Sequence, residues 1–150
     1  MRTLLSTLIL SVAVNAAEVQ KTNEQFVVAK GLAVRPFATQ AQLSNPSSID
    51  VDDRGRVWVA EAFNYRKKTR KAGDRILILE DSNADGRADK TTVFYQNPDI
   101  DGVHGVCVLG NMAIVSVSDR ILLITDTDGD DKADAKKVLF TGKVLNPVNG

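Results

Sequence analysis

The sequence predicts an all-β chain that forms part of a β-propeller, with about two four-stranded blades and a calcium-type acidic loop between two strands of each. An internal repeat is the first reason: "DRILILEDSNADGRADKTTVFY" from Asp74 matches "DRILLITDTDGDDKADAKKVLF" from Asp119 without a gap, 45 residues later. That period is typical of one propeller blade. Second, short runs rich in β-branched residues, such as "RILILE" and "MAIVSVS", lie between Gly, Asp and Asn, which indicates strands. Beyond the N-terminal segment, apolar residues show no helical spacing over a helix-length window.

The N-terminal residues have the features of a signal peptide. Arg2 supplies a short positive start, residues 4–14 are apolar and uncharged, and Val14-Asn15-Ala16 has the small-residue pattern of a cleavage site. The apolar run is too short to cross a bilayer as a helix. We therefore expect residues 1–16 to be removed, no membrane span, and residues 17–150 to be the N-terminal part of a propeller domain that is periplasmic or secreted.

The elements follow the same order in each unit, after an N-terminal strand region in "EQFVVAKGLAVRPFA". Residues 47–60 and 104–117 each predict a hairpin, because two apolar runs flank a polar turn, and we align the two hairpins without a gap. The first unit then has extra residues in "FNYRKKTRKAG". A third strand, the acidic loop and a fourth strand complete each unit. Two units cannot close a ring of about four to eight blades, so we expect a fragment, with a third unit starting at "VLNPVNG".

Oxygen-bearing side chains recur in both acidic loops at the spacing of metal ligands. They are Asp81, Asn83, Asp85 and Asp89 in the first loop, and Asp126, Asp128, Asp130 and Asp134 in the second. A loop that wraps round a hard cation turns alternate side chains inward, and we expect the backbone carbonyls of Arg87 and Lys132 to add ligands. Because the set contains neither imidazole nor thiolate, Ca²⁺ is the predicted metal, in a structural role. The alternative is a solvated turn whose Asp and Asn side chains bond their own backbone.

The sixth position of each loop distinguishes the two copies. A backbone with positive φ is needed there, and Gly86 provides it in the first loop. The second loop has Asp131 at this position, which predicts a cost of about 1 kcal/mol or the use of Gly129 instead.

Few other residues are candidates for chemistry. His104 is the only histidine and could act as a base at the axial channel, although a lone histidine without a partner is more often structural. Cys107, Trp58 and Phe94 are predicted to be buried. Lysine plus arginine equal aspartate plus glutamate at 19 each, so the net charge does not favour nucleic acid as a partner. The basic run "RKKTRK" predicts a solvated loop, with docking of an anionic partner as the alternative.

The motifs "NPSSIDVDDRGRVWVAE", "DRILILEDSNADGRADKTTVF" and "RILLITDTDGDDKADAKKVLFTG" are similar to the N-terminal propeller of the membrane-bound dehydrogenases abundant in Planctomycetes and Verrucomicrobia. That family is related to the glucose/sorbosone dehydrogenases that depend on pyrroloquinoline quinone (PQQ). The resemblance extends from about Phe26 to Gly142. It implies a propeller module that oxidises a small sugar or alcohol with PQQ and passes electrons to a cytochrome c domain or partner.

This segment has no complete catalytic set of its own, so the remaining blades of a longer chain are its expected partners. The rival interpretation is a non-catalytic, calcium-stabilised propeller that binds glycans or protein partners. A further alternative is an inactive truncated copy.

Overall fold

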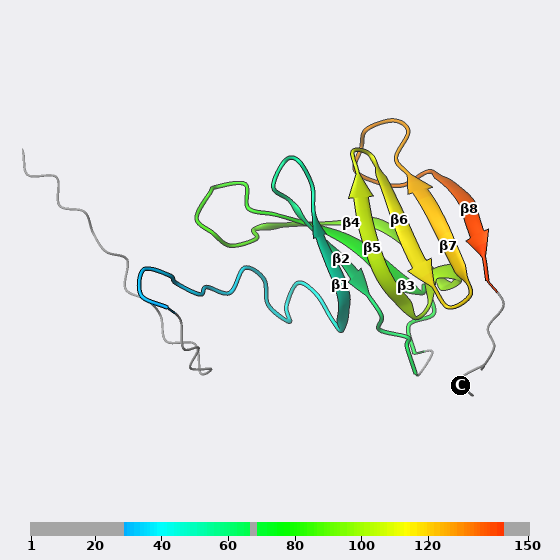
Figure 1. The fold of residues 1–150 in the computed structure, drawn as a ribbon, viewed down its shortest axis with the longest axis horizontal. Coiled ribbons are helices and arrows are strands. Elements are labelled where there is room, and N and C mark those ends of the chain that lie inside the picture. Colours follow the sequence, from blue (N-terminus) through cyan, green and yellow to red (C-terminus); the bar gives the residue numbers. More distant parts are fainter. Residues whose placement is uncertain (1–28, 67–68, 143–150) are drawn as a thin grey trace, which may run out of the picture. The chain divides into compact units, whose positions relative to one another are not determined.

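The structure is a computed structural model that describes residues 29–66 and 69–142. These residues form two four-stranded antiparallel sheets (Figure 1). The first sheet contains β1 (Pro46–Val51), β2 (Val57–Glu61), β3 (Asp74–Glu80) and β4 (Lys90–Asn97), in that spatial order. The second contains β5 (Val103–Leu109), β6 (Met112–Val117), β7 (Arg120–Thr125) and β8 (Ala135–Thr141), also in chain order. One short 3-10 helix, η1 (Pro98–Ile100), connects the sheets. The predicted all-β fold with two four-stranded units is confirmed.

The main hydrophobic core lies where the two sheets pack against each other. Because side chains alternate along a strand, one face of the first sheet contributes Trp58, Ile76 and Ile78, and Val115 and Leu122 oppose them from the second sheet. Full burial of an aliphatic side chain of this size stabilises the fold by about 1.5–3 kcal/mol. Trp58 also contacts Phe94 edge-on, with ring centroids 4.5 Å apart, which confirms both as core residues.

A smaller core covers the opposite face of the first sheet. Val59, Leu77 and Leu79 are buried there, and the segment that precedes β1 packs over them with Phe37 and Leu43, among others. This segment, residues 37–45, corresponds in position to the end of the first sheet, residues 94–102, at an offset of 57, with Phe37 matching Phe94 and Leu43 matching Ile100.

Each acidic loop donates a backbone hydrogen bond to the preceding unit. The amide of Ala133 donates to the carbonyl of Phe94 over 2.8 Å, and the amide of Ala88 donates to the carbonyl of Phe37 over the same distance. Phe94 is the extra residue of a β-bulge in β4, since Tyr95 pairs with Ile76 and Val93 pairs with Leu77. Residues 37–45 therefore contact the first sheet in the way that the end of β4 and η1 contact the second.

The gapless hairpin alignment was wrong by one residue in the second strand. Ile49 pairs with Val59, and its counterpart 57 residues on, Val106, pairs with Val115, which is only 56 residues after Val59. Between the equivalent pairs Val51–Val57 and Val108–Ala113, the second hairpin is one residue shorter than the first. A shift of one residue moves a side chain to the other face of a sheet, so Trp58 and Val115 are not equivalent.

Two further expectations were wrong. Cys107 is exposed, because Val106 and Val108 take the inward positions of β5 and the residue between them points outward. The N-terminal strand region forms no strand over residues 29–38, while residues 24–28 lie outside the described range. Gly31 at φ 90° and Pro36, which has no N–H, disfavour a strand there. Residues 29–34 fall in a separate compact unit from the sheets.

Candidate functional site

The first acidic loop joins β3 to β4 and is tied together by its own side chains. The carboxylate of Asp81 accepts hydrogen bonds from the amides of Asp85 and Gly86, at 3.1 and 2.7 Å. Asn83 Oδ1 also accepts from the amide of Asp85, and Asp85 Oδ1 from the amide of Arg87. These bonds place the predicted ligands on one small turn.

Asp89 closes this loop. Its Oδ1 accepts from both the amide and the hydroxyl of Ser82, which lowers the pKa of the Asp89 carboxyl. The amide of Asp89 in turn donates to the carbonyl of Glu80 at the end of β3.

The second acidic loop, between β7 and β8, has a similar pattern of bonds, except that its first aspartate accepts from the residue three positions later instead of four. Asp126 accepts from the amides of Gly129 and Asp131, at 2.7 and 2.9 Å. Asp130 Oδ1 accepts from the amide of Lys132, and Asp134 accepts from the amide and hydroxyl of Thr127. Burial raises the pKa of the Asp126 carboxyl, but these backbone hydrogen bonds outweigh that effect and lower it.

Three carboxylates of the second loop converge. One oxygen each from Asp126, Asp128 and Asp130 lies within 4.8 Å of the others. Carboxylate oxygens at this separation fit a hard cation such as Ca²⁺, and Asn83 replaces one carboxylate in the first loop. The donor set therefore suits the predicted metal, although bonds within a polar turn account for the same geometry.

Each loop has two residues with positive φ, but glycine occupies a different one in each. Ala84 (φ 60°) and Gly86 (φ 87°) adopt this conformation in the first loop, and Gly129 (φ 85°) and Asp131 (φ 63°) do so in the second. In the second loop, positive φ thus occurs at both Gly129 and Asp131, which the sequence analysis gave as alternatives. Left-handed backbone is costly for Ala84 and Asp131, at about 1 kcal/mol or more each.

Asp131 is held in this conformation by a buried arginine of the first sheet. Arg56 is 6% exposed; its Nη1 donates to Asp131 Oδ1 and its Nε to Asp52 Oδ2, both at 2.7 Å. Trp58 Nε1 also donates to Asp52. Burial raises the pKa of Asp52, but the hydrogen bonds from Trp58 and Arg56 outweigh it and lower the pKa below its ordinary value. This network, which sequence reasoning missed, ties the second loop to the first sheet.

A second buried charged group lies in the first sheet. Glu61 is fully buried and accepts hydrogen bonds from Arg70 and Arg75, at 2.6 to 2.9 Å, and from the amide of Ser44. These bonds outweigh the effect of burial and lower the pKa of the Glu61 carboxyl. Arg70 lies in the long β2–β3 connection and Arg75 lies in β3, so Glu61 anchors the end of that insertion rather than forming a free acid.

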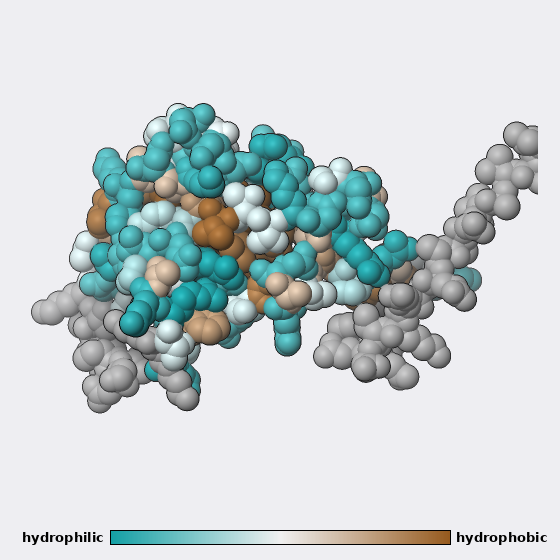
Figure 2. All heavy atoms as spheres, turned by 180° about the vertical axis from the view of Figure 1, so that it is seen from behind, coloured by the Kyte–Doolittle hydropathy of each residue, from teal (hydrophilic) through white to brown (hydrophobic). Residues whose placement is uncertain are grey.

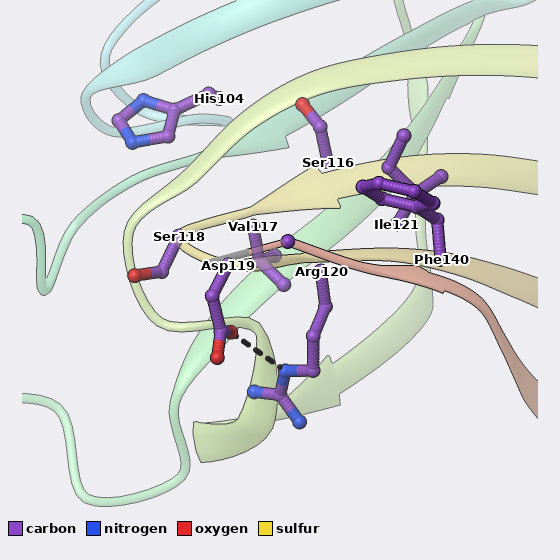
Figure 3. Close-up of a pocket in the computed structure, with 9 residues that line it drawn as sticks. His104, Ser116, Val117, Ser118, Asp119, Arg120, Ile121 and Phe140 are labelled. Atoms are coloured by element: carbon purple, nitrogen blue, oxygen red, sulfur yellow. Dashed lines mark hydrogen bonds and ion pairs between the residues drawn. The ribbon is translucent and has the colours of Figure 1, made fainter. Parts of the chain in front are cut away.

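His104 is exposed near the start of β5, where it meets Tyr65 edge-on with ring centroids 5.7 Å apart. It lines a pocket of about 460 Å³ with Arg120, Phe140 and others (Figure 3). No hydrogen bond reaches its imidazole from the side chains or backbone of residues 29–66 and 69–142. The acidic loops are not among the residues that line this pocket. His104 and the predicted metal ligands thus form separate sites.

A family model described as a domain of unknown function (DUF7133) matches residues 18–149. The chain belongs to this family. No curated protein matches the sequence of this DUF7133 chain. Among the described residues, no helix is long and apolar enough to cross a membrane.

Two solved structures share the fold of the DUF7133 chain. One is the holo form of the PQQ domain of a pyranose dehydrogenase from Coprinopsis cinerea, with a TM-score of 0.58 and 25% identity over 77% of this chain. The other is a carbohydrate-active enzyme of family AA12 from Trichoderma reesei, with a TM-score of 0.55 and 20% identity over 77% of this chain. The DUF7133 chain spans only 25% and 27% of their lengths.

Proposed function

We propose that this chain is the N-terminal propeller segment of a dehydrogenase-like protein that oxidises sugars or alcohols with PQQ outside the cytoplasm. The observation that carries the proposal is the match to the PQQ domain of pyranose dehydrogenase, at 25% identity and a TM-score of 0.58. The chain spans a quarter of that structure, so the activity requires further blades and a ring that they complete.

The described residues do not form a quinone site by themselves. The cationic candidates at the pocket of about 460 Å³ are His104 and Arg120. Arg120 already donates to Asp119 Oδ1 and to the carbonyl of Asp99. PQQ is a polyanion, and such a ligand requires more free cationic groups than these. We therefore assign no catalytic step to this segment beyond the candidate base His104.

The enzymatic proposal is tested with the full natural polypeptide that contains this chain. Added PQQ and Ca²⁺ should give sugar- or alcohol-dependent reduction of an artificial electron acceptor, and His104→Asn should lower the turnover without loss of PQQ binding. If PQQ does not bind and glycans bind without oxidation, the rival non-catalytic propeller is correct. Electron transfer to an added cytochrome c would support the expected partner.

We also propose that both acidic loops bind Ca²⁺ and stabilise the blades. In the second loop, the convergence of Asp126, Asp128 and Asp130 supports this. Trp58 is the only tryptophan, and it lines a pocket of about 180 Å³ together with Asp126 and Gly129. Tb³⁺ is a luminescent substitute for Ca²⁺, so Trp58 excitation should sensitise an ion in the second loop selectively.

Asp130→Ala should abolish this luminescence, whereas Asp85→Ala in the first loop should leave it intact. Excess Ca²⁺ should compete with Tb³⁺. Absence of sensitised luminescence, together with no heat of Ca²⁺ binding by calorimetry, would show that the loops are solvated polar turns.

A further inference from the structure

The connection between β2 and β3, residues 62–73, has no counterpart of similar length in the second sheet, where only residues 118 and 119 separate β6 from β7. It carries two exposed aromatic side chains, Phe63 at 41% and Tyr65 at 50% exposure. Exposed apolar groups also occur elsewhere, and Figure 2 shows such groups among polar ones, so exposure alone does not mark a binding site. The way in which this connection holds its two rings distinguishes them.

A buried amide side chain between the two rings holds the connection in place. Asn64 is 4% exposed, and its Oδ1 accepts hydrogen bonds from the amides of Thr69 and Arg70, at 3.1 and 2.9 Å. Its Nδ2 donates to the carbonyl of Arg70 over 2.8 Å. A buried amide whose hydrogen bonds are satisfied fixes the backbone on either side of it. Phe63 and Tyr65 are therefore held at the surface by their buried neighbour.

An arginine guanidinium lies over each of the two rings. Arg70 Cζ is 4.2 Å from the ring centroid of Phe63, and Arg66 Cζ is 5.4 Å from that of Tyr65. Arg70 also donates to the buried Glu61, so its charge is already balanced. Arg66 is exposed and forms no ion pair within residues 29–66 and 69–142. Because a guanidinium keeps its charge and its planar set of donors, Arg66 has donors available for a ligand at Tyr65.

Tyr65 brings the connection into contact with the candidate base of the second sheet. Its ring meets the exposed imidazole of His104 edge-on, at an interplanar angle of 81° and with ring centroids 5.7 Å apart. A Cβ at Gly102 would lie 4.0 Å from Tyr65 Cδ2, so the ring also lies close to the chain that leads into β5. A ligand that covers Tyr65 is therefore next to the His104 imidazole.

The charge of the connection favours an anionic ligand. Residues 62–73 contain five basic residues and no acidic one. The preceding carboxylate, Glu61, is fully buried and accepts hydrogen bonds from two arginines. Arg66 and Lys71 are exposed. The electrostatic potential at the surface of the connection is therefore positive, although basic and acidic residues are equal in number over the whole chain.

A sugar ring with an acidic group matches an aromatic ring beside a guanidinium. One face of a pyranose ring presents C–H bonds, which pack against the negative face of an aromatic ring. A carboxylate on the same sugar pairs with a planar guanidinium through two parallel N–H donors.

We propose that Tyr65 and Arg66 bind a sugar unit that carries a carboxylate, a uronic acid, beside His104. Tyr65 packs against the C–H face of the ring, and Arg66 donates to the carboxylate. The choice of a sugar rests on the proposed function, whereas the carboxylate follows from Arg66 and from the charge of the connection. The β2–β3 insertion of the first sheet then determines which sugars reach His104.

Calorimetric binding to the full natural polypeptide that contains this chain tests the proposal, without an electron acceptor. The ligands are a galacturonate trimer and its methyl ester, which keeps the sugar rings and removes their charge. The trimer should bind about tenfold more tightly than the ester, because the ester cannot form charge-assisted hydrogen bonds with Arg66. Arg66→Gln should weaken binding of the trimer to the level of the ester and leave the ester unchanged. Arg54→Gln, at the opposite end of β2, should change neither affinity because the Arg54 side chain is 60% exposed and remote from Tyr65 in the fold.

Variants of Tyr65 test the contact with the sugar ring. Tyr65→Ala should weaken binding of both ligands about tenfold, since both present the same C–H face. Tyr65→Phe keeps the aromatic ring and should bind as the wild type, which excludes a folding defect as the cause of the loss. Unchanged binding in Tyr65→Ala, or equal affinity of the wild type for trimer and ester, would overturn the proposal.

The proposed oxidation and this inference fail in different ways. If the trimer binds as expected and no sugar is oxidised after addition of PQQ and an electron acceptor, the enzymatic proposal is wrong and the uronate site stands. If neutral sugars are oxidised but the trimer does not bind, the enzymatic proposal stands and the uronate site is wrong.

Discussion

Replacing Arg56 should destabilise the protein far more than replacing the neighbouring Arg54. Arg56→Met leaves the Asp52 carboxylate, whose side chain is 2% exposed, without its cation. Loss of one partner from a buried ion pair costs about 3–5 kcal/mol. Asp52 keeps hydrogen bonds from Trp58 Nε1 and from the amides of Arg54 and Arg56, so we expect the lower limit, about 3 kcal/mol.

The ion pair between Arg56 and Asp131 should contribute less to the free energy of unfolding than the pair between Arg56 and Asp52. The Asp131 side chain is 27% exposed, so water partly replaces Arg56 when the pair is broken. We expect Asp131→Asn to cost about 1 kcal/mol. Asp131→Gly also relieves the left-handed backbone at φ 63°, and its net effect should be close to zero.

The assay is urea denaturation at pH 7, followed by the fluorescence of the single tryptophan, Trp58. Arg54→Met is the matched control, because the Arg54 side chain is 60% exposed and its distance to Asp131, 4.0 Å, is long for an ion pair. We expect this substitution to lower the free energy of unfolding by less than about 0.5 kcal/mol. All variants are compared at one protein concentration. Equal losses for Arg54→Met and Arg56→Met would refute the reasoning, since burial of the pair would then make no difference.

The same network predicts a dependence on pH. The folded pKa of Asp52 lies below its ordinary value of 3.8, so its contribution is present above pH 3.8 and is lost as the pH falls through the folded pKa. In Arg56→Met, loss of the cation raises the pKa of Asp52 relative to the wild type. The difference in unfolding free energy between wild type and Arg56→Met should therefore narrow as the pH falls through the two folded pKa values of Asp52, at about 1.4 kcal/mol per unit of difference between them. A constant difference would show that Asp52 is not the titrating group.

Three other predictions concern the loops and the sheet edges. Ca²⁺ should raise the melting temperature and EDTA should lower it, with Asp85→Ala and Asp130→Ala each removing one of two sites in a calorimetric titration; unchanged melting with both reagents contradicts the metal proposal. Ala84→Gly should stabilise the protein by about 0.5–1 kcal/mol in urea denaturation, because Ala84 is exposed at φ 60°, and a loss of stability would contradict the strain. Residues 17–150 expressed alone should self-associate through unpaired sheet edges, and a stable monomer in analytical ultracentrifugation would contradict the expected need for further blades.

Patterns local to the chain predicted most of the fold. The 45-residue repeat identified the third strand, the acidic loop and the fourth strand of both units, because hydrophobic alternation and turn residues act within a few residues. The hairpin alignment failed by one residue because the turn lengths differ, and a sequence match cannot show which residues pair across a turn. That error hid the different positions of Trp58 and Val115.

The candidate sites were less predictable. The oxygens of Asp126, Asp128 and Asp130, which their spacing singled out, lie close together, while their role as metal ligands stays a prediction. The bond between Arg56 and Asp131, 75 residues apart, depends on how the two sheets pack, and no local pattern contains that information. A charged residue inside a hairpin of apolar strands was the one available signal. Glu61 was missed for a different reason: its partners Arg70 and Arg75 are close in sequence, but their approach depends on how the β2–β3 insertion folds back onto the first sheet.

We interpret the acidic loops as contacts between successive blades. Each loop donates one amide to the chain that precedes its sheet, from Ala133 to the bulge residue Phe94 of β4 and from Ala88 to Phe37 in the segment before β1. At the second loop, the carboxylate of Asp131 also accepts a hydrogen bond from Arg56, which explains why a residue other than glycine is retained at φ 63°. An ion bound by the loop would fix these donors in place without approaching His104. Calcium would then act on the stability of the ring, and its removal should loosen the contact between blades before it affects any chemistry at the pocket.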